Sequence, residues 1–284
     1  MTASHHPHDE STTLDSTAHL MNRISSQLAS QLSVVSLNGS RRPGPPALVL
    51  VAHGSRDPRA LSTVRALVER VRELRPGLPV HLGHIELNEP RLTDTLTALG
   101  PTDAVLVPLL LARGYHVKRD IPGLAAETQA RARVAPPLGP HPLLVETLYG
   151  RLVEAGWGEQ PRRGSAVVLA AAGSRDPDSK LDTNHTAQLL ADRLGVPVIP
   201  AYASAATPTV STAVRALAAR GHHRVAVASC FTAPGRFATQ CAEAAPWIAS
   251  APLGAHPAMA RLVLHRYDQA MSTTEATAPE LASA

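Results

Sequence analysis

A unit of about 110 residues occurs twice in this chain of 284 residues. Three segments of the first copy return in the second: AHGSRDP (52–58) as AAGSRDP (171–177), EPRLTDTLTAL (89–99) as TPTVSTAVRAL (207–217), and PLGPHP (137–142) as PLGAHP (252–257). Their separations of 119, 118 and 115 residues keep both order and spacing. Because solenoid repeats are only roughly 20–50 residues long, this period indicates a duplicated domain.

Each copy alternates short apolar runs with segments in which apolar residues recur at helical spacing. The expected strands are 47–52, 79–86, 104–111 and 133–138 in the first copy, and 166–171, 196–203, 224–231 and 247–253 in the second. Alternating strands and helices favour a parallel sheet with right-handed crossovers. We therefore predict an α/β protein of two tandem similar domains, each a parallel sheet flanked by helices.

The composition of the intervening and terminal segments predicts the domain boundaries. Ser, Thr, Ala and Pro are abundant near both ends of the chain, where apolar periodicity is weak. The expected organisation is a disordered or loosely attached extension (1–46), a first domain (47–155), a linker (156–164), a degenerate second copy (165–270) and a disordered tail (271–284).

Charge and hydropathy exclude several classes of protein. No apolar stretch approaches the roughly 20 residues of a membrane span, and no basic segment followed by an apolar run opens the chain, so we expect a cytoplasmic protein without a membrane partner. Only two cysteines are present, too few for a zinc or iron–sulfur motif. The net charge of +4 and the 3% aromatic content suit a small anionic ligand and not a nucleic acid.

Three polar residues stand where the first copy's strands end. His53 follows the first strand, Glu86 lies at the end of the second, and His116 follows the third. Parallel strands bring their carboxyl ends to one edge of the sheet, where ligands bind. Two imidazoles and a carboxylate could hold Fe²⁺, Co²⁺, Ni²⁺ or Zn²⁺ with coordination positions left open, or could form a general acid–base site.

The second copy serves as an internal control for these three residues. It carries Ala172, Ser204 and Phe237 at the positions of His53, Glu86 and His116. By contrast, the GSRDP turn and the histidines of the PLG-x-HP segments, His141 and His256, survive in both copies. We infer that the three variable residues carry chemistry and that the two retained histidines are structural.

The segments VLVAHGSRDP, IELNEP and VPLLLARGYHVKRDIP resemble those of the sirohydrochlorin chelatases, in the class II chelatase superfamily. The resemblance implies two chelatase-like domains with an active-site cleft between them. It also implies His53 and His116 as metal ligands, with Glu86 completing the metal site or assisting proton removal. The activity implied is that of a metal chelatase, a lyase, which inserts Fe²⁺ or, next, Co²⁺ into sirohydrochlorin for sirohaem or cobalamin.

The chemistry of such a reaction extends the prediction to other residues. Sirohydrochlorin bears many carboxylates, so basic residues around the histidine motifs are candidate anchors: Arg56, Arg113, Lys118 and Arg119. Neither a GxGxxG motif nor a P-loop is present, and we expect no permanently bound cofactor. The expected partners are the tetrapyrrole and the metal ion, and the chain could act as a monomer or a homodimer.

Two other functions stay open on the residues alone. A carrier could bind the tetrapyrrole or the metal without turnover. A histidine phosphatase could place a histidine after its first strand in an RHG motif, although Ala52 stands here where the phosphoryl-binding arginine should be.

Overall fold

The computed structural model describes residues 44–158, 160 and 162–275. Everything below concerns the part of the chain from Pro46 onward. The predicted extension therefore lies almost wholly outside the described residues, as do residues 276–284 of the predicted tail.

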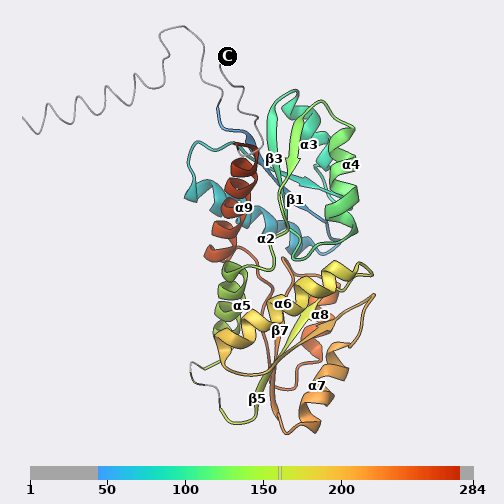
Figure 1. The fold of residues 1–284 in the computed structure, drawn as a ribbon, viewed down its shortest axis with the longest axis vertical. Coiled ribbons are helices and arrows are strands. Elements are labelled where there is room, and N and C mark those ends of the chain that lie inside the picture. The colour runs from blue at the N-terminus through green and yellow to red at the C-terminus, as the bar shows by residue number, and fades with distance from the viewer. Residues whose placement is uncertain (1–43, 159, 161, 276–284) are drawn as a thin grey trace, which may run out of the picture. The chain divides into compact units, whose positions relative to one another are not determined.

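Two four-stranded parallel sheets form the framework, one from each copy of the repeat (Figure 1). The first has the order β2-β1-β3-β4 and the second β6-β5-β7-β8. Their strands are β1 (Ala47–Ala52), β2 (Val80–His84), β3 (Asp103–Pro108), β4 (Arg131–Val134), β5 (Ser165–Ala171), β6 (Val198–Tyr202), β7 (Arg224–Ser229) and β8 (Ile248–Ala249). The predicted fold class is thereby confirmed.

Helices connect and cover the strands. They are α2 (Pro58–Leu74), α3 (Leu92–Leu99), the short π-helix η1 (His116–Asp120), α4 (Ile121–Ala126), α5 (Pro142–Glu154), α6 (Pro177–Leu194), α7 (Val210–Ala219), α8 (Arg236–Glu243) and α9 (Pro257–Glu275). The repeated GSRDP turn starts α2 and α6 in the same way, since Asp57 and Asp176 cap these helices and a proline follows each.

The central strands are buried because they are apolar on both faces, as parallel strands between helix layers require. The strands of the first sheet nevertheless end earlier than predicted, β2 at His84 and β3 at Pro108. Beyond β2 the chain turns through Leu87, whose φ of 67° lies in the left-handed region. The predicted strand ends thus become loops at the carboxyl edge of the sheet.

The last helix of each copy covers the sheet of the other copy (Figure 1). Helix α5 packs against α6 and β7, whereas α9 packs against α2 and β3. The Tyr267 hydroxyl of α9 donates to the Pro46 carbonyl at 2.7 Å, and Asp268 pairs with Arg75 at the end of α2. The largest hydrophobic cluster accordingly contains residues of both sheets.

Helix α9 corrects the predicted start of the C-terminal tail at residue 271. The helix continues to Glu275, and Met271 packs against the core. The hydroxyl groups of Ser272 and Thr273 donate to the carbonyls of Asp268 and Gln269, each at 3.0 Å, which stabilises this last turn. The polar composition was misleading because those polar groups bond back to the helix.

The two histidines retained in both copies cap helices. The backbone amide of Leu143 donates to Nδ1 of His141 at 3.1 Å, and that of Ala258 donates to Nδ1 of His256 at 3.2 Å. Each ring nitrogen thus satisfies one of the free N–H groups at a helix start. Their inferred structural role agrees with this geometry.

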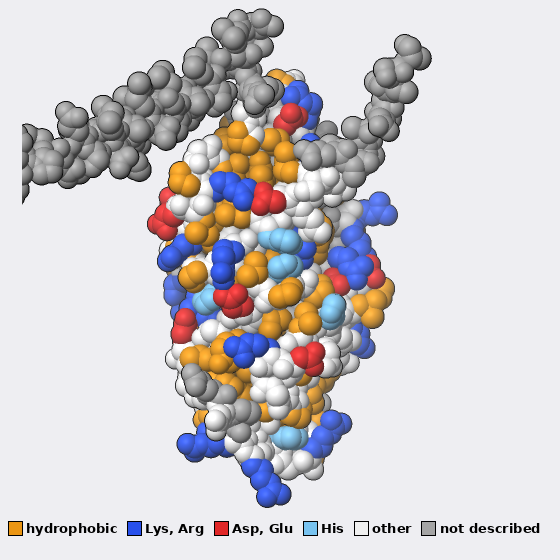
Figure 2. Space-filling model, turned by 60° about the vertical axis from the view of Figure 1, so that its left-hand side comes forward, with side chains coloured by type: hydrophobic (Ala, Val, Ile, Leu, Met, Phe, Trp, Pro, Cys, Tyr) orange, Lys and Arg blue, Asp and Glu red, His pale blue; other side chains and the backbone are white. Residues whose placement is uncertain are grey.

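The distribution of surface charge and the apolarity of the helices are the two features that would reveal a polyanion-binding face or a membrane span. On the face drawn in Figure 2, Lys and Arg side chains are scattered among acidic and hydrophobic ones. Within the described part of the chain, no helix combines the length and apolarity that crossing a bilayer requires.

Candidate metal-handling site

His53 and His116 meet at the carboxyl edge of the first sheet. His53 directly follows β1, and His116 begins η1, two residues after Gly114. Their Nε2 atoms lie 3.1 Å apart, and the rings meet edge to face at an angle of 87°. About 40% of each side chain is exposed. Two residues 63 positions apart in sequence thus present their nitrogens at one point open to solvent.

A carboxylate lies at the opposite edge of each ring. Oε1 of Glu86 is 3.4 Å from Nδ1 of His53, and Nδ1 of His116 donates to Oδ2 of Asp120 at 2.5 Å. An ionised carboxylate can only accept, so it favours the tautomer that carries the proton on Nδ1. The Nε2 lone pairs of the two rings are then directed at each other, which is the arrangement found when a metal binds at Nε2.

This geometry corrects the predicted ligand role of Glu86. Its carboxylate contacts Nδ1 of His53, whereas His116 faces Nε2, so the predicted three ligands do not converge on one point. Among the described residues, no group of three His, Cys, Asp or Glu side chains is placed to hold a metal ion. The contact that Glu86 makes here is with Nδ1 of His53, on the side of the ring away from His116.

Sequence reasoning missed Asp120. Its signal was the spacing in HVKRD (116–120), which puts the carboxylate four residues after the histidine and hence one helical turn away. In the second copy, Cys241 occupies the position of Asp120. The internal comparison could therefore have identified Asp120 in the same way as His53 and His116.

A cleft of about 980 Å³ opens beside His53. One wall comes from the loop after β1 and the start of α2, and the other from residues 231–243 of the second copy. Apolar side chains that line it include Leu87, Leu110, Ala172, Phe231 and Phe237. This volume is at the upper end of the range typical of small-molecule sites.

The four basic residues predicted to bind the carboxylates of the substrate differ in their surroundings. Arg56 is exposed and lines the cleft. Arg113 is paired with Asp182, and Lys118 with Asp176, so neither is free as predicted. Both are tied to carboxylates at the start of α6 that sequence alone could not place beside them.

Of two further arginines, Arg119 and Arg236, only Arg236 lines the cleft. Arg119 is exposed on η1 but is not among the residues that line the cleft. Arg236, one residue before Phe237, lines the wall opposite Arg56. Its counterpart in the first copy is Tyr115, so the histidine motifs gave no signal for it.

The turn that carries His53 depends on glycine. Gly54 has φ of 104°, and a Cβ there would lie 1.8 Å from the carbonyl oxygen of Glu86. Gly173 is its counterpart, with φ of 89°, and a Cβ there would lie 2.0 Å from the carbonyl oxygen of Ser204. Both copies therefore need this residue for close backbone approach, whether or not a histidine precedes it.

Comparison with known proteins defines the class to which this fold and histidine site belong. The CbiX family model matches residues 47–155 and 166–270, so both copies are recognised. The chain belongs to this family, that of the sirohydrochlorin chelatases.

Several relatives carry chelatase names. A sirohydrochlorin ferrochelatase of Bacillus subtilis (strain 168) is 33% identical over 172 residues, 57% of this chain and 64% of the relative. A sirohydrochlorin ferrochelatase of Priestia megaterium is 26% identical over 80% of this chain and 91% of the relative. A sirohydrochlorin cobaltochelatase of the same organism is 25% identical, over 66% of this chain and 65% of the relative. The chain thus covers just under two thirds of two of these three proteins.

Solved structures share the fold. SirB from Bacillus subtilis with Fe³⁺ superimposes with a TM-score of 0.66 at 25% identity, covering 82% of this chain and 98% of that one. CbiX, described as the terminal enzyme of siroheme biosynthesis in denitrifying bacteria, gives a TM-score of 0.62 at 21% identity, covering 79% and 99%.

Proposed function

We propose that this protein is a sirohydrochlorin chelatase that inserts a divalent metal ion into the macrocycle. The observation that carries the proposal is the pair of facing Nε2 atoms of His53 and His116, each ring backed by a carboxylate, beside a large cleft. The names of the family's relatives supply the substrate.

The two histidines suit an ion that must be handed over. Two nitrogen ligands hold a borderline divalent metal, and the remaining positions admit the pyrrole nitrogens of the ring one after another. A complete protein cage would instead trap the ion. Glu86 and Asp120 keep the rings oriented while the metal–Nε2 bonds break.

The same four residues balance the protons of the reaction. Insertion breaks two pyrrole N–H bonds, forms metal–nitrogen bonds to the ring and releases two protons. When the metal leaves, the Nε2 atoms of His53 and His116 face each other at 3.1 Å and share one of these protons, while the other passes to solvent. The carboxylates at the Nδ1 atoms stabilise the imidazolium ion so formed before solvent removes its proton.

The cleft suits a flat, acidic macrocycle. Its walls carry Leu87, Phe231 and Phe237 for contact with the ring, and Arg56 and Arg236 on opposite sides for the peripheral carboxylates. Within the described residues neither guanidinium is engaged by a carboxylate, and that of Arg236 lies 5.8 Å from the centre of the Phe237 ring. Both are therefore available to an anionic ligand.

We propose Fe²⁺ as the metal ahead of Co²⁺. Histidine nitrogens accept both ions, and relatives are named for both. Support for iron comes from the Priestia megaterium ferrochelatase, which aligns with 80% of this chain, against 66% for the cobaltochelatase of the same organism.

An anaerobic spectrophotometric assay tests the proposal. Sirohydrochlorin is mixed with Fe²⁺ or Co²⁺, with and without the protein, and the initial rate of metallation is measured. We expect acceleration with both ions and a higher kcat/KM with Fe²⁺. Binding of sirohydrochlorin with a rate equal to the uncatalysed one would make the protein a carrier, and hydrolysis of phosphate esters without metallation would make it a phosphatase.

A further inference from the structure

The two copies of the repeat contact each other through two equivalent pairs of segments. A Cβ added to Gly114, just before His116, would lie 3.7 Å from Oγ of Ser174 at the start of α6. A Cβ added to Gly235, just before Phe237, would likewise lie 3.7 Å from Oγ of Ser55 at the start of α2. Gly114 corresponds to Gly235 and Ser174 to Ser55, so the two contacts are related by the repeat.

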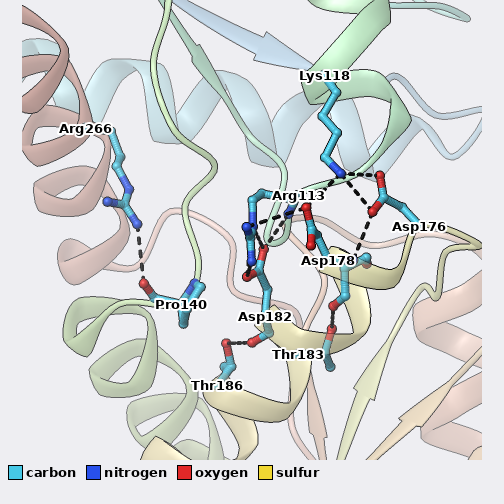
Figure 3. A network of polar contacts seen from close by, with 10 residues as sticks. Arg113, Lys118, Pro140, Asp176, Asp178, Asp182, Thr183, Thr186 and Arg266 are labelled. Atoms are coloured by element: carbon cyan, nitrogen blue, oxygen red, sulfur yellow. Dashed lines mark hydrogen bonds and ion pairs between the residues drawn. The ribbon is translucent and has the colours of Figure 1, made fainter.

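One of these contacts is closed by ion pairs (Figure 3). Lys118 Nζ donates to both oxygens of Asp176, at 2.9 and 2.7 Å, and to Oδ2 of Asp178 at 2.9 Å. Arg113 donates to Asp182 from its backbone amide at 2.8 Å and from its guanidinium at 2.7–3.1 Å. We call these five residues the interdomain clamp.

The interdomain clamp is built around a buried carboxylate. Asp182 is only 5% exposed, and both of its oxygens accept from Arg113. Charged groups are rarely buried unless they are paired in this way. Because Asp182 is buried and accepts several bonds from the half-exposed Arg113, the pair restrains its segment better than a fully exposed pair would.

The other contact lacks both cations and two of the three carboxylates, and its remaining carboxylate, Asp57 at the position of Asp176, pairs with Arg59 of its own copy. Pro234 and Thr239 stand at the positions of Arg113 and Lys118, and both line the open cleft. Opposite them, Arg59 and Thr63 replace Asp178 and Asp182. The contact next to His116 is thus closed by ion pairs, whereas the residues of the equivalent contact line the cleft.

The interdomain clamp includes a residue of the His116 segment on each side of the histidine. Arg113 lies three residues before His116 and Lys118 two residues after it, whereas their carboxylate partners all belong to the second copy. The segment is a short π-helix with no buried residue of its own. Its position therefore depends on contacts such as those of Lys118 within the helix and of Arg113 just before it.

We propose that Asp176, Asp178 and Asp182 of the second copy are positioning residues that hold His116 opposite His53. The catalytic relevance of this role rests on the proposed function, while the restraint itself does not. The second copy, which has no histidine at the positions of His53 and His116, contributes in this way to the metal site of the first.

Hydrogen exchange in the metal-free full chain tests the restraint. Lys118→Met and Arg113→Met remove the cations, Lys118→Arg keeps the charge, and Arg75→Met breaks the Arg75–Asp268 pair between α2 and α9 as a matched control. We expect the amides of residues 113–120 to exchange about tenfold faster in the two Met variants at Lys118 and Arg113. They should keep the wild-type rate in Arg75→Met. Unchanged exchange in both clamp variants would overturn the proposal.

Titration with Co²⁺ alone, followed by its visible absorption, measures the consequence for the metal site. Affinity should fall about tenfold in Lys118→Met and Arg113→Met, while Lys118→Arg restores most of it and Arg75→Met stays within twofold. Thermal midpoints verify that each variant is folded. Wild-type affinity in folded clamp variants would contradict the positioning role. Wild-type protein that binds Co²⁺ through His53 but never metallates sirohydrochlorin would refute the proposed function and leave the clamp standing.

Discussion

Nε2 of His53 lies 3.1 Å from Nε2 of His116, and the other nitrogen of each ring faces a carboxylate. With Nδ1 protonated on both rings, this contact is a hydrogen bond only if one Nε2 also carries a proton. Under the proposed function, a divalent ion would take the place of that proton between the two nitrogens. The metal-free geometry is thus already arranged around the place where a metal would bind.

Removing either histidine should abolish metallation without unfolding the protein. His53→Ala and His116→Ala each delete one of two protein ligands, and we expect the rate to fall at least about 100-fold. Both side chains lie about 40% exposed beyond the strand ends, so thermal midpoints should shift little. Ser204→Ala alters the equivalent of Glu86 in the second copy, outside the cleft lining, and should leave rates within a few fold. Full activity in both histidine variants would return His53 to the role of a turn residue.

Asp120→Asn should weaken the metal site through His116. An amide oxygen still accepts from Nδ1 but carries no charge, so the ring becomes a poorer ligand, and Co²⁺ affinity should drop about 10-fold. Glu86→Gln should act similarly on His53, with a smaller effect because its contact is longer, 3.4 Å against 2.5 Å. Equal affinity in Asp120→Asn and wild type would show that the carboxylate does not tune the ligand.

Arg236→Gln and Arg56→Gln should raise KM for sirohydrochlorin about fivefold each and leave kcat nearly unchanged, since both residues would contact carboxylates far from the metal. Increasing salt should reduce the difference from wild type by screening. Arg70→Gln, on the exposed face of α2, is the control. A kcat effect without a KM effect would place these arginines elsewhere in the mechanism.

Gly54→Ala should be far more damaging than Gly77→Ala. Both glycines have positive φ, but a Cβ meets nothing within 4 Å at Gly77 and the Glu86 carbonyl oxygen at 1.8 Å at Gly54. We expect a loss of about 1 kcal/mol in the free energy of unfolding for Gly77→Ala, from backbone strain. For Gly54→Ala the loss should exceed about 3 kcal/mol, because the turn after β1 and the loop that carries Glu86 must also move apart. Denaturant unfolding of both variants measures the two losses. Similar losses would contradict the close approach of Gly54 to the Glu86 carbonyl.

Acid should destabilise the protein partly through His141. Burial, with Arg266 and His265 nearby, lowers the pKa of His141 to about 4, and the unfolded value is about 6.5. Between these values the unfolded chain binds a proton that the folded chain does not. The stability contributed by neutral His141 is therefore complete above about pH 6.5 and is lost as pH falls towards 4.

His141→Asn isolates this effect, since asparagine also caps helices but does not titrate. The thermal midpoint of the variant should fall less than that of wild type between pH 7 and pH 4. Other acid-sensitive groups are common to both proteins and cancel in the difference. Parallel curves for the two proteins would show that His141 does not contribute.

The sequence predicted those parts of the site that depend on a single sheet. The run ALVLVA (47–52) is apolar on both faces and ends at a glycine turn, so β1 and the place of His53 followed directly. His116 was expected beside it because parallel strands share a carboxyl edge. The contact of 3.1 Å bears out that reasoning.

Features that depend on packing between the copies were beyond sequence reasoning. Arg113 and Lys118 look like free cations in their own segment, but their partners lie 58 to 69 residues away at the start of α6. The side of the His53 ring that Glu86 contacts is set by the turn at Leu87, which no periodicity reveals. The local sequence allows several rotamers and turns at these positions, and tertiary contacts determine which one is adopted.

The exchange of α5 and α9 between the sheets makes each copy an obligate part of the other's interior. Cutting the chain at 156–164 would leave the first sheet without α9 and the second without α5, each with an apolar face in water. The two copies should therefore melt in a single cooperative transition. The second copy, which has no counterpart of His53 or His116, is then still indispensable, because deleting it would expose the apolar face of the first sheet that α9 covers.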